Sequence, residues 1–402
     1  MLPGFNPRVS RIRESPTRRI DEIREELSRI GRDIILLSTG QPSIPPPRYA
    51  REKLARDLFE ESMDLYSYTP TRGISTVREA VVADLEEDGL ELGEGDLALT
   101  AGGQSALFAA LSALFQEGDE VIVFDPMYFG YWPLLDYLGL RARVIPEDIE
   151  AGFQPDLSVV NEALKPGFTK GIILVTPDNP TGRVVEESVA RGLAEIAVDN
   201  DLWLIVDEAY RTLVYEGRHS YIYNYAPDNV VALGAFSKDP GIPGWRLGYA
   251  YGPREAVRRI SLVVQETVYC PPSVAQRLVK YYLESGEKRA HREAVRRVYK
   301  TRRDAAIQAV ERYIPGARYA RPQGGMFLFV DLSPAYPNLD SEELARRLLR
   351  EKSVAVVPGV YFSRRYTSSL RVSFVSEAVE RIAEGIRRIG ELLDESRRGS
   401  PR

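Results

Sequence analysis

The stretch LGAFSKDPGIPGWRLGYAYG, residues 233–252, joins two short apolar runs through a segment rich in glycine and proline. Lys238 directly follows the first run, in a chain that holds only eight lysines against 45 arginines. Apolar runs bounded by turn residues are typical of buried strands. The stretch therefore predicts two strands of a covered sheet, with a lysine at the end of the first.

Seven runs of this kind divide residues 96–252, and segments of helical periodicity such as 104–116 and 186–200 lie between several of them. The runs are DLALTA (96–101), EVIVFDP (120–126), RARVIP (141–146), GIILVTP (171–177), LWLIVDE (202–208), VVALGAF (230–236) and LGYAYG (247–252). Strands that are apolar throughout belong to a sheet covered on both faces. We expect an α/β unit with a mainly parallel seven-stranded sheet covered by helices.

The pattern changes after about residue 285, where a long charged helix is expected over residues 287–314. Short strands are expected at 326–332, 353–358 and 369–374, separated by helices at 340–351 and 376–395. This pattern predicts a second, smaller α+β domain. The expected parts are an N-terminal segment packing on the small domain (1–45), a large domain (46–285) and a small C-terminal domain (286–402).

The composition is that of a globular protein with no nucleic-acid or membrane partner. The 402 residues are 44% hydrophobic and 28% charged, with a net charge of −5. The sequence lacks both a run of about eighteen apolar residues and an N-terminal apolar stretch of signal-peptide length, so we expect a cytoplasmic protein. The single cysteine, Cys270, excludes an intramolecular disulfide. Two distant histidines, His219 and His291, argue against a metal site or a Ser-His-Asp triad.

Polar residues follow five of the predicted strands, where ligands bind in open α/β sheets. They are found in residues 101–105, 125–128, 177–182, 207–210 and 237–238. Each has an ordinary explanation when taken alone, as a tight turn, a helix cap, a core aromatic or a solvated cation. The ordinary explanation is weakest for Lys238, because it stands directly between an apolar strand and a loop rich in glycine and proline.

The chemistry of these residue types points to one cofactor. A lysine at the end of a buried strand is partly desolvated, which lowers its pKa and frees the amine to form a Schiff base. A buried carboxylate such as Asp207 can keep a pyridine nitrogen protonated. With a phosphate site and a flat stacking partner, these demands describe pyridoxal 5′-phosphate.

The motifs resemble those of the class I/II pyridoxal-phosphate-dependent aminotransferases, the aspartate aminotransferase-like group of fold type I. The resemblance covers nearly the whole chain, and its motifs follow the family's order. They are STGQPSIPPP (38–47), NPTG (179–182), DEAY (207–210), SKDPGIPGWRLGY (237–249) and LRVSF (370–374). The resemblance implies transamination between an L-amino acid and a 2-oxo acid, with glutamate and 2-oxoglutarate as one pair.

The resemblance also implies roles in cofactor binding. Lys238 would hold pyridoxal 5′-phosphate as a Schiff base and carry the proton between Cα and C4′. Asp207 would pair with the ring nitrogen, while Asn179 and Tyr210 would bind the ring 3′-oxygen. Tyr128 would stack on the ring. The residues implied for the phosphate are Gly103, Gln104, Ser105, Ser237 and Arg246.

Substrate binding and assembly follow from the same resemblance. Arg371 would clamp the substrate α-carboxylate, with Asn179 and the backbone around Gly40 closing on the same group. Tyr68 matches a tyrosine that reaches the phosphate of the neighbouring subunit, so a homodimer is expected.

The side chain that the substrate carries is left open by the sequence. Gln104 stands where relatives that recognise an acidic side chain have a lysine. We hypothesise that Arg18 or Arg19 supplies the charge instead, although a solvated position at a helix start is at least as good an explanation for both. The many tyrosines keep aromatic substrates open as well.

Two departures from the family pattern and two alternative functions bear on this assignment. Asp239-Pro240 and DEAY differ from the usual residues after the lysine and around the acidic motif, but neither removes a catalytic group. C–S lyases and other enzymes of fold type I share these residue roles, so the fold alone does not settle the reaction. A non-catalytic protein that senses pyridoxal 5′-phosphate is the alternative from a different class.

Overall fold

A computed structural model describes residues 4, 6–12, 18–60 and 63–399. Its centre is a seven-stranded sheet in the order β2-β8-β7-β6-β5-β3-β4. The strands are β2 (Leu97–Thr100), β3 (Glu120–Asp125), β4 (Arg141–Pro146), β5 (Thr169–Val175), β6 (Trp203–Asp207), β7 (Val230–Ala235) and β8 (Gly248–Tyr251). Strand β8 runs antiparallel to β2 and β7, whereas the other neighbouring pairs are parallel. The predicted sheet is confirmed.

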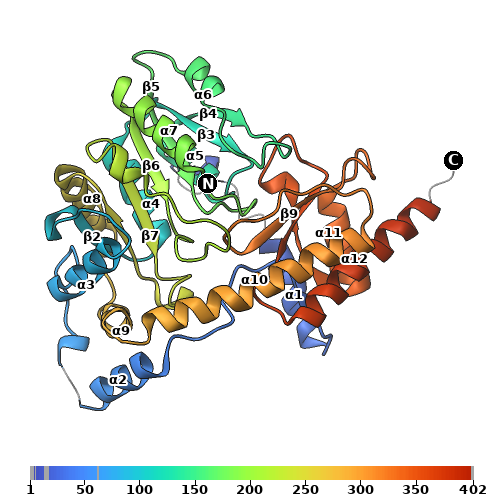
Figure 1. Cartoon of the computed structure of the whole chain (residues 1–402), viewed down its shortest axis with the longest axis horizontal. Helices are drawn as coiled ribbons and strands as arrows, with labels where there is room; N and C mark the ends of the chain where they lie inside the picture. The colour runs from blue at the N-terminus through green and yellow to red at the C-terminus, as the bar shows by residue number, and fades with distance from the viewer. Residues whose placement is uncertain (1–3, 5, 13–17, 61–62, 400–402) are drawn as a thin grey trace.

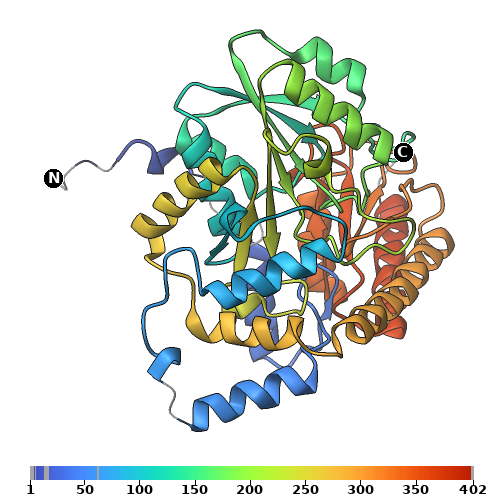
Figure 2. The same ribbon diagram turned by 60° about the vertical axis from the view of Figure 1, so that its left-hand side comes forward.

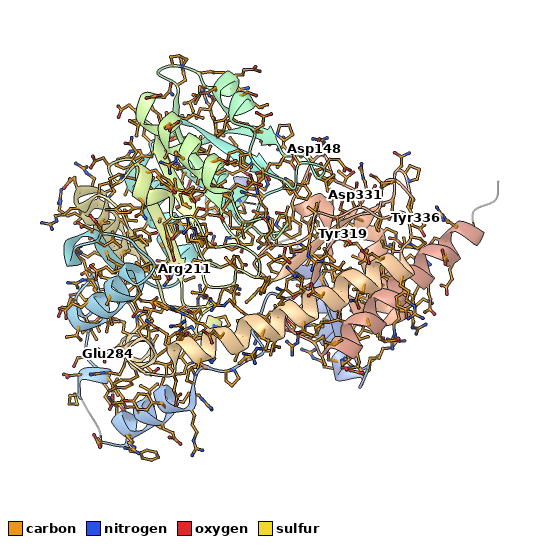
Figure 3. The ribbon with its side chains drawn as sticks, in the orientation of Figure 1. Asp148, Arg211, Glu284, Tyr319, Asp331 and Tyr336 are labelled. Carbon is orange, nitrogen blue, oxygen red and sulfur yellow. The ribbon has the colours of Figure 1, made fainter. Side chains whose placement is uncertain are left out.

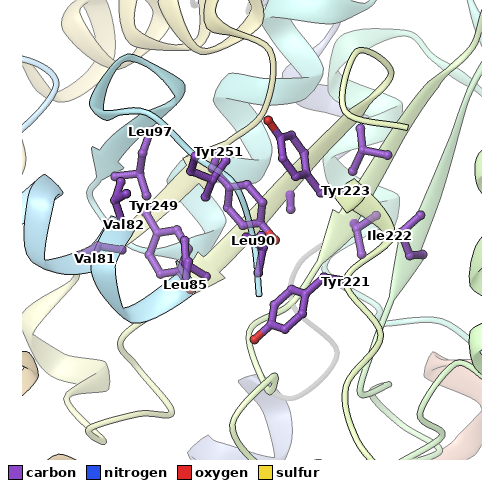
Figure 4. Packing of buried hydrophobic residues seen from close by; sticks show 14 of the residues in the cluster. Val81, Val82, Leu85, Leu90, Leu97, Tyr221, Ile222, Tyr223, Tyr249 and Tyr251 are labelled. Carbon is purple, nitrogen blue, oxygen red and sulfur yellow. The ribbon is translucent and has the colours of Figure 1, made fainter. Parts of the chain in front are cut away.

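Helices cover both faces of this sheet (Figures 1 and 2). Along β5, Ile172 and Leu174 pack into one apolar core, while Ile173 and Val175 pack into a second core on the opposite face. Figure 4 shows part of the first core. Its helices are α2 (Arg48–Phe59), α3 (Ser75–Glu86), α6 (Leu157–Ala163), α7 (Glu187–Asp199) and α9 (Ser273–Leu283). The second core is closed by α4 (Gly103–Leu114), α5 (Tyr131–Leu138) and α8 (Arg254–Val268).

A smaller unit lies beside the large sheet (Figure 1). It contains a three-stranded antiparallel sheet in the order β11-β12-β9, and a short parallel pair, β1 with β10. The strands are β1 (Ile35–Leu36), β9 (Phe327–Asp331), β10 (Val354–Ala355), β11 (Val357–Pro358) and β12 (Ser369–Ser373). Because Ile35 pairs with Val354, the N-terminal part of the chain is packed against the C-terminal part.

Four helices belong to this part of the molecule, and one of them joins the two units. They are α1 (Arg18–Arg29), α10 (Lys288–Tyr313), α11 (Ser341–Lys352) and α12 (Val379–Gly399). Helix α10 starts below the large sheet and ends against α12 (Figure 1). The domain boundaries at residues 45 and 285 stay a prediction.

Short 3-10 helices complete the fold at Val9–Arg11, Met63–Leu65, Glu94–Asp96, Ile222–Tyr225, Pro243–Trp245 and Gly359–Tyr361. Within the described ranges, no helix combines the length and the apolar character needed to cross a bilayer. The same residues hold no cluster of three or more histidine, cysteine or acidic side chains placed to bind a metal ion.

Candidate active site

A cavity of about 430 Å³ lies at the carboxyl ends of β5, β6 and β7, between the large sheet and the three-stranded sheet. Most of the predicted site residues line it. They are Gly40, Gly103, Gln104, Tyr128, Asn179, Asp207, Tyr210, Ser237, Lys238, Arg246 and Arg371. Parallel strands end at the same edge of a sheet, which brings Asn179, Asp207 and Lys238 together, while Gly40 and Arg371 reach the same space from the small unit.

Lys238 follows the end of β7 and reaches into the cavity. Its Nζ donates a hydrogen bond to the carbonyl oxygen of Gly40 at 2.8 Å. Burial lowers the pKa of the amine from 10.5 to about 8, with a further lowering by the charge of Arg371 and an opposing effect of Asp207. The amine is therefore close to half neutral near pH 8, as a nucleophile or a proton carrier requires.

Asp207 is the last residue of β6 and is held by two donors. Its Oδ1 accepts a hydrogen bond from the backbone N–H of Ala209, and its Oδ2 accepts one from the Tyr131 hydroxyl, both at 3.0 Å. Burial raises the pKa of Asp207, and these two hydrogen bonds oppose the rise. Burial also raises the pKa of Tyr131 well above its ordinary value, so the phenol remains a donor.

A glycine turn and an arginine form one end of the cavity. Gly102 has φ +94°, and a Cβ built on it would lie 2.6 Å from Nη2 of Arg246. Gly248 of β8 packs so closely that its Cβ would lie 2.7 Å from the Gly102 carbonyl carbon. Helix α4 begins at Gly103, and the first N–H groups of a helix have no partner within it. Free N–H groups beside a guanidinium form a site suited to an anion.

Arg371 of β12 enters the cavity from the small unit. Its Nη1 donates to Oδ1 of Asn179 at 3.0 Å, and its Nη2 donates to the carbonyl oxygen of Ser38 at 2.6 Å. Its Nε is buried without a hydrogen-bond partner among the described residues. The guanidinium carbon lies 4.0 Å from the ring centre of Phe327 and 4.9 Å from that of Phe362. Burial lowers the pKa of Arg371 to about 10, which leaves it charged at neutral pH.

Aromatic rings form the walls between these polar groups. Tyr128 and Tyr131 meet edge to face with ring centres 5.6 Å apart, and Tyr210 meets Phe327 in the same way at 6.2 Å. Burial raises the pKa of both Tyr128 and Tyr210, so these phenols stay protonated. The cavity therefore offers flat apolar surfaces with hydroxyl donors at their edges.

Three of the predicted site residues are not shown lining the cavity. Ser105 lies on α4, one residue beyond Gln104, and does not line it. Tyr68 is 83% exposed and packs its ring against Tyr269, with ring centres 5.0 Å apart. The side chain of Arg18 lies outside the described part of the chain, as does that of Arg19, although their backbone starts α1. Ile20, the next residue on α1, lines the cavity.

Sequence reasoning did not assign roles to four residues that shape the site: Ser38, Tyr131, Phe327 and Phe362. Ser38 begins the STGQPSIPPP motif (38–47), so a role of its carbonyl in the site could have been predicted. Tyr131 opens the helix after β3, but nothing in the sequence directs its hydroxyl to Asp207. The two phenylalanines read as ordinary core residues, and only the packing on Arg371 reveals them.

Comparison with known proteins identifies the family. Residues 32–389 match the family model of aminotransferases of class I and II. The aspartate/prephenate aminotransferase of Thermus thermophilus is 32% identical over 397 residues, covering 98% of this chain and 99% of that protein. The aspartate aminotransferase of Thermotoga maritima is 30% identical, covering 96% and 98% of the two chains.

The structure gives the same result. The aspartate aminotransferase of Thermus thermophilus solved with maleate superposes with a TM-score of 0.91 at 32% identity, over 97% of this chain and all of the other. The fold type and the enzyme class predicted from the motifs are both confirmed. This protein belongs to the class I and II aminotransferases.

Proposed function

We propose that this aminotransferase binds pyridoxal 5′-phosphate between Lys238 and Asp207. The observation that carries the proposal is that an amine with a lowered pKa and a buried carboxylate line one cavity with a glycine turn at its end. The donor set fits the cofactor, because it combines an amine, a carboxylate, phenols and a cationic anion site. When bound, the cofactor supplies an aldehyde that condenses with amines and a ring that withdraws electrons from their α-carbon.

The ring would be held by residues of the large unit. Asp207, kept in place by Ala209 and Tyr131, would bind the ring nitrogen. Asn179 and Tyr210 would bind the 3′-oxygen, and Tyr128 would lie against the ring face. The residues proposed for the phosphate are Gly103, Gln104, Ser105, Ser237 and Arg246, with Ser105 acting only through its N–H near the start of α4.

Lys238 and Arg371 would act on the substrate. The Lys238 amine would take the proton from the substrate α-carbon and deliver it to C4′ of the cofactor. Its pKa near 8 permits both steps. Arg371 would bind the α-carboxylate through its unpartnered Nε and an Nη group, the bidentate geometry that a guanidinium favours. Asn179 and the backbone at Gly40 would fix the same end of the substrate.

Glutamate and 2-oxoglutarate are the proposed common pair, and the second substrate is left to experiment. Gln104 gives the cavity no charge for an acidic side chain, so Arg18 or Arg19 would have to supply it. Ile20 supports this option because it brings the start of α1 to the cavity. A loss of kcat/KM in Arg18→Ala or Arg19→Ala that is restricted to acidic amino acids would support the option. The same fold-change from wild type on acidic and neutral amino acids would contradict it.

We also propose a cytoplasmic homodimer, in which Tyr68 reaches the phosphate site of the partner. Five exposed large apolar or aromatic side chains, of which Tyr68 and Tyr269 are in contact, support this arrangement. They are Phe59, Met63, Tyr66, Tyr68 and Tyr269. Sedimentation should give twice the chain mass, and Tyr68→Phe should weaken cofactor binding. A monomer with full activity would contradict the proposal.

The test of cofactor binding uses the purified protein with added pyridoxal 5′-phosphate. We expect a yellow protein, and borohydride should fix the chromophore on Lys238 alone among the eight lysines. Lys238→Ala should carry no covalently bound cofactor after the same treatment, while Lys170→Ala, which changes an exposed lysine, should be labelled like wild type and serves as the control. Mixing the loaded enzyme with each amino acid in turn then identifies the donor. A wild-type protein that stays colourless, or a label on another lysine, would contradict the assignment.

A further inference from the structure

Five charged residues with side chains no more than 13% exposed form a cluster that starts beside Lys238 and lies outside the active-site cavity. We call them the rear cluster: Asp84 of α3, Arg211 after β6, Asp239 after β7, and Lys288 and Arg292 of α10. Side-chain exposure in the cluster runs from 1% for Asp84 to 13% for Asp239. Figure 3 labels Arg211, which lies at the end of the large sheet above the start of α10. The proposed reaction uses none of these side chains.

Asp239, the residue after Lys238, is bonded on both of its oxygens. The Tyr282 hydroxyl donates to Oδ1 at 2.5 Å, and Nε of Arg292 donates to Oδ2 at 2.7 Å. The other two nitrogens of Arg292 bind Asp84, at 2.7 Å to Oδ1 and 2.8 Å to Oδ2. Paired, charge-assisted hydrogen bonds of this kind fix direction as well as distance. The backbone that carries Lys238 is therefore tied to α10.

The same cluster reaches the end of the neighbouring strand. Asp84 also binds Nζ of Lys288 at 2.9 Å and Nη2 of Arg211. Burial alone would raise the pKa of Asp84, but the charges of Arg211, Arg292 and Lys288 hold it well below its usual value. Arg211 follows Tyr210 in the chain, so the strand ends that present Tyr210 and Lys238 share one charged support.

Helix α10 continues from this support to the small unit, as Figure 1 shows. Just past the middle of α10, Nη1 of Arg302 donates to Oγ of Ser43 at 2.7 Å and to the carbonyl oxygen of Val375 at 2.5 Å. Val375 lies two residues beyond the end of β12, the strand that carries Arg371. One helix thus connects the segment that carries the lysine to the segment that carries the carboxylate-binding arginine.

We propose that Asp239 is a positioning residue, whose ion pair with Arg292 fixes Lys238 to α10 and thereby holds Lys238 in register with Arg371. This inference rests on the proposed function of both residues. A small cavity of about 10 Å³ between Lys238 and α10 shows that the two are packed almost directly together.

The first test changes Asp239 to asparagine, which keeps the shape and removes the charge facing Arg292. The control is Glu87→Gln, because Glu87 binds Lys288 at the rim of the cluster, 64% exposed and away from Asp239. In the half-reaction we expect Asp239→Asn to lower kcat at least about tenfold and to leave KM within about twofold, because Arg371 still binds substrate. The isotope effect with Cα-deuterated substrate should increase, since proton transfer by Lys238 becomes slower. Glu87→Gln should behave as wild type.

The second test needs no cofactor and measures the pH midpoint for reductive methylation of Lys238 in the apo-protein. The charged or titratable groups that face this amine are Asp207, Tyr210, Arg246 and Arg371 in the cavity. His291, on the α10 side, has a pKa that burial lowers from 6.5, so it stays neutral near pH 8. An amine released from its place beside Gly40 becomes better hydrated, so the midpoint should rise above 8 in Asp239→Asn. Loss of a negative charge alone would lower it.

The outcomes separate the two proposals. A midpoint that stays or falls, an unchanged isotope effect, or a loss of kcat that merely follows lost cofactor would overturn the role of Asp239. Wild-type protein that binds no pyridoxal 5′-phosphate would contradict the proposed function, while the midpoint in the apo-protein would still decide the role of Asp239. If Asp239→Asn does not fold, Arg292→Lys replaces it with the same expected results, because a lysine cannot bridge Asp84 and Asp239 as the guanidinium does.

Discussion

Arg371 donates a hydrogen bond from Nη1 to Oδ1 of Asn179 at 3.0 Å, across 192 residues of sequence. The contact joins β12 of the small unit to the loop after β5 of the large sheet. A residue proposed to bind the substrate therefore touches a residue proposed to bind the ring. Changes on either side of this contact should affect both functions.

Replacing Arg371 by lysine should raise the KM for the amino acid about 10- to 100-fold, because hydrogen bonds to charged groups contribute about 1.5–3 kcal/mol. The ammonium keeps the charge but cannot bind a carboxylate with two parallel N–H groups while also holding Asn179 and Ser38. Half-reaction kinetics give the value, with Arg364→Lys as the control on an arginine that stacks on Trp132. An unchanged KM would remove Arg371 from the substrate site.

Lys238 should lower the free energy of unfolding of the apo-protein at neutral pH. Burial favours the neutral amine in the folded state, with a pKa of about 8, while the unfolded chain keeps a value of 10.5. Between these values the unfolded state binds more protons, so the free energy of unfolding gains a positive slope with pH. The free energy of unfolding of Lys238→Met should exceed that of wild type by up to about 3 kcal/mol below pH 8, since each pKa unit corresponds to about 1.4 kcal/mol.

Urea unfolding of the apo-proteins from pH 7 to 10 measures this difference, which should shrink as the pH rises above 8. Lys170→Met is the matched control, because Lys170 is exposed on β5 and should show no such trend. A constant difference between wild type and Lys238→Met would show that the amine is not desolvated.

Tyr131→Phe should weaken binding of pyridoxal 5′-phosphate. The change removes the donor to Oδ2 of Asp207, which raises the pKa of that carboxyl further and frees it to rotate. We expect the Kd to rise about 10-fold or more, in line with a hydrogen bond to a charged group. Tyr137→Phe on the same helix is the control, since its ring packs on Phe108 instead. Equal Kd values for the two variants would rule out this role of Tyr131.

Gly102→Ala should affect both stability and cofactor binding. Gly102 and Gly118 have nearly the same φ, +94° and +96°, so alanine strains the backbone similarly at both, by about 1 kcal/mol. Only at Gly102 would the new Cβ collide with Arg246, since nothing lies within 4 Å at Gly118. Both variants should lower Tm, but only Gly102→Ala should weaken cofactor binding. A similar Kd in the two variants would place Arg246 outside the phosphate site.

The sequence predicts the strands and the strand-end residues because their signals are local. An apolar run followed by Asp207 or by Lys238 can be read within ten residues, and parallel topology then brings the ends together. Ser105 shows where this reasoning stops: it is in the expected motif, but on α4 the next position after Gln104 turns by about 100°. The motif locates the helix start, and the helical phase decides which side chains face the cavity.

Contacts between residues far apart in the sequence could not be predicted in this way. Arg292 lies 53 residues from Asp239 and 208 residues from Asp84, and all three read as members of charged helix or loop surfaces. The Phe327 and Phe362 rings against Arg371 are hidden for the same reason, because a core phenylalanine and one that packs on a guanidinium look alike in sequence. Only the packing of distant segments separates them.

The length of helix α10 turns a small change in its direction into a larger displacement of its far end. It has 26 residues, and the stretch from Arg292 to Tyr313 is about 30 Å long at 1.5 Å per residue. A tilt of about 5° about a pivot at Arg292 would move the far end by about 3 Å, which is the scale of one hydrogen bond. A small rotation at Arg292 would therefore displace α12, which packs against α10, while Arg292 itself would hardly move.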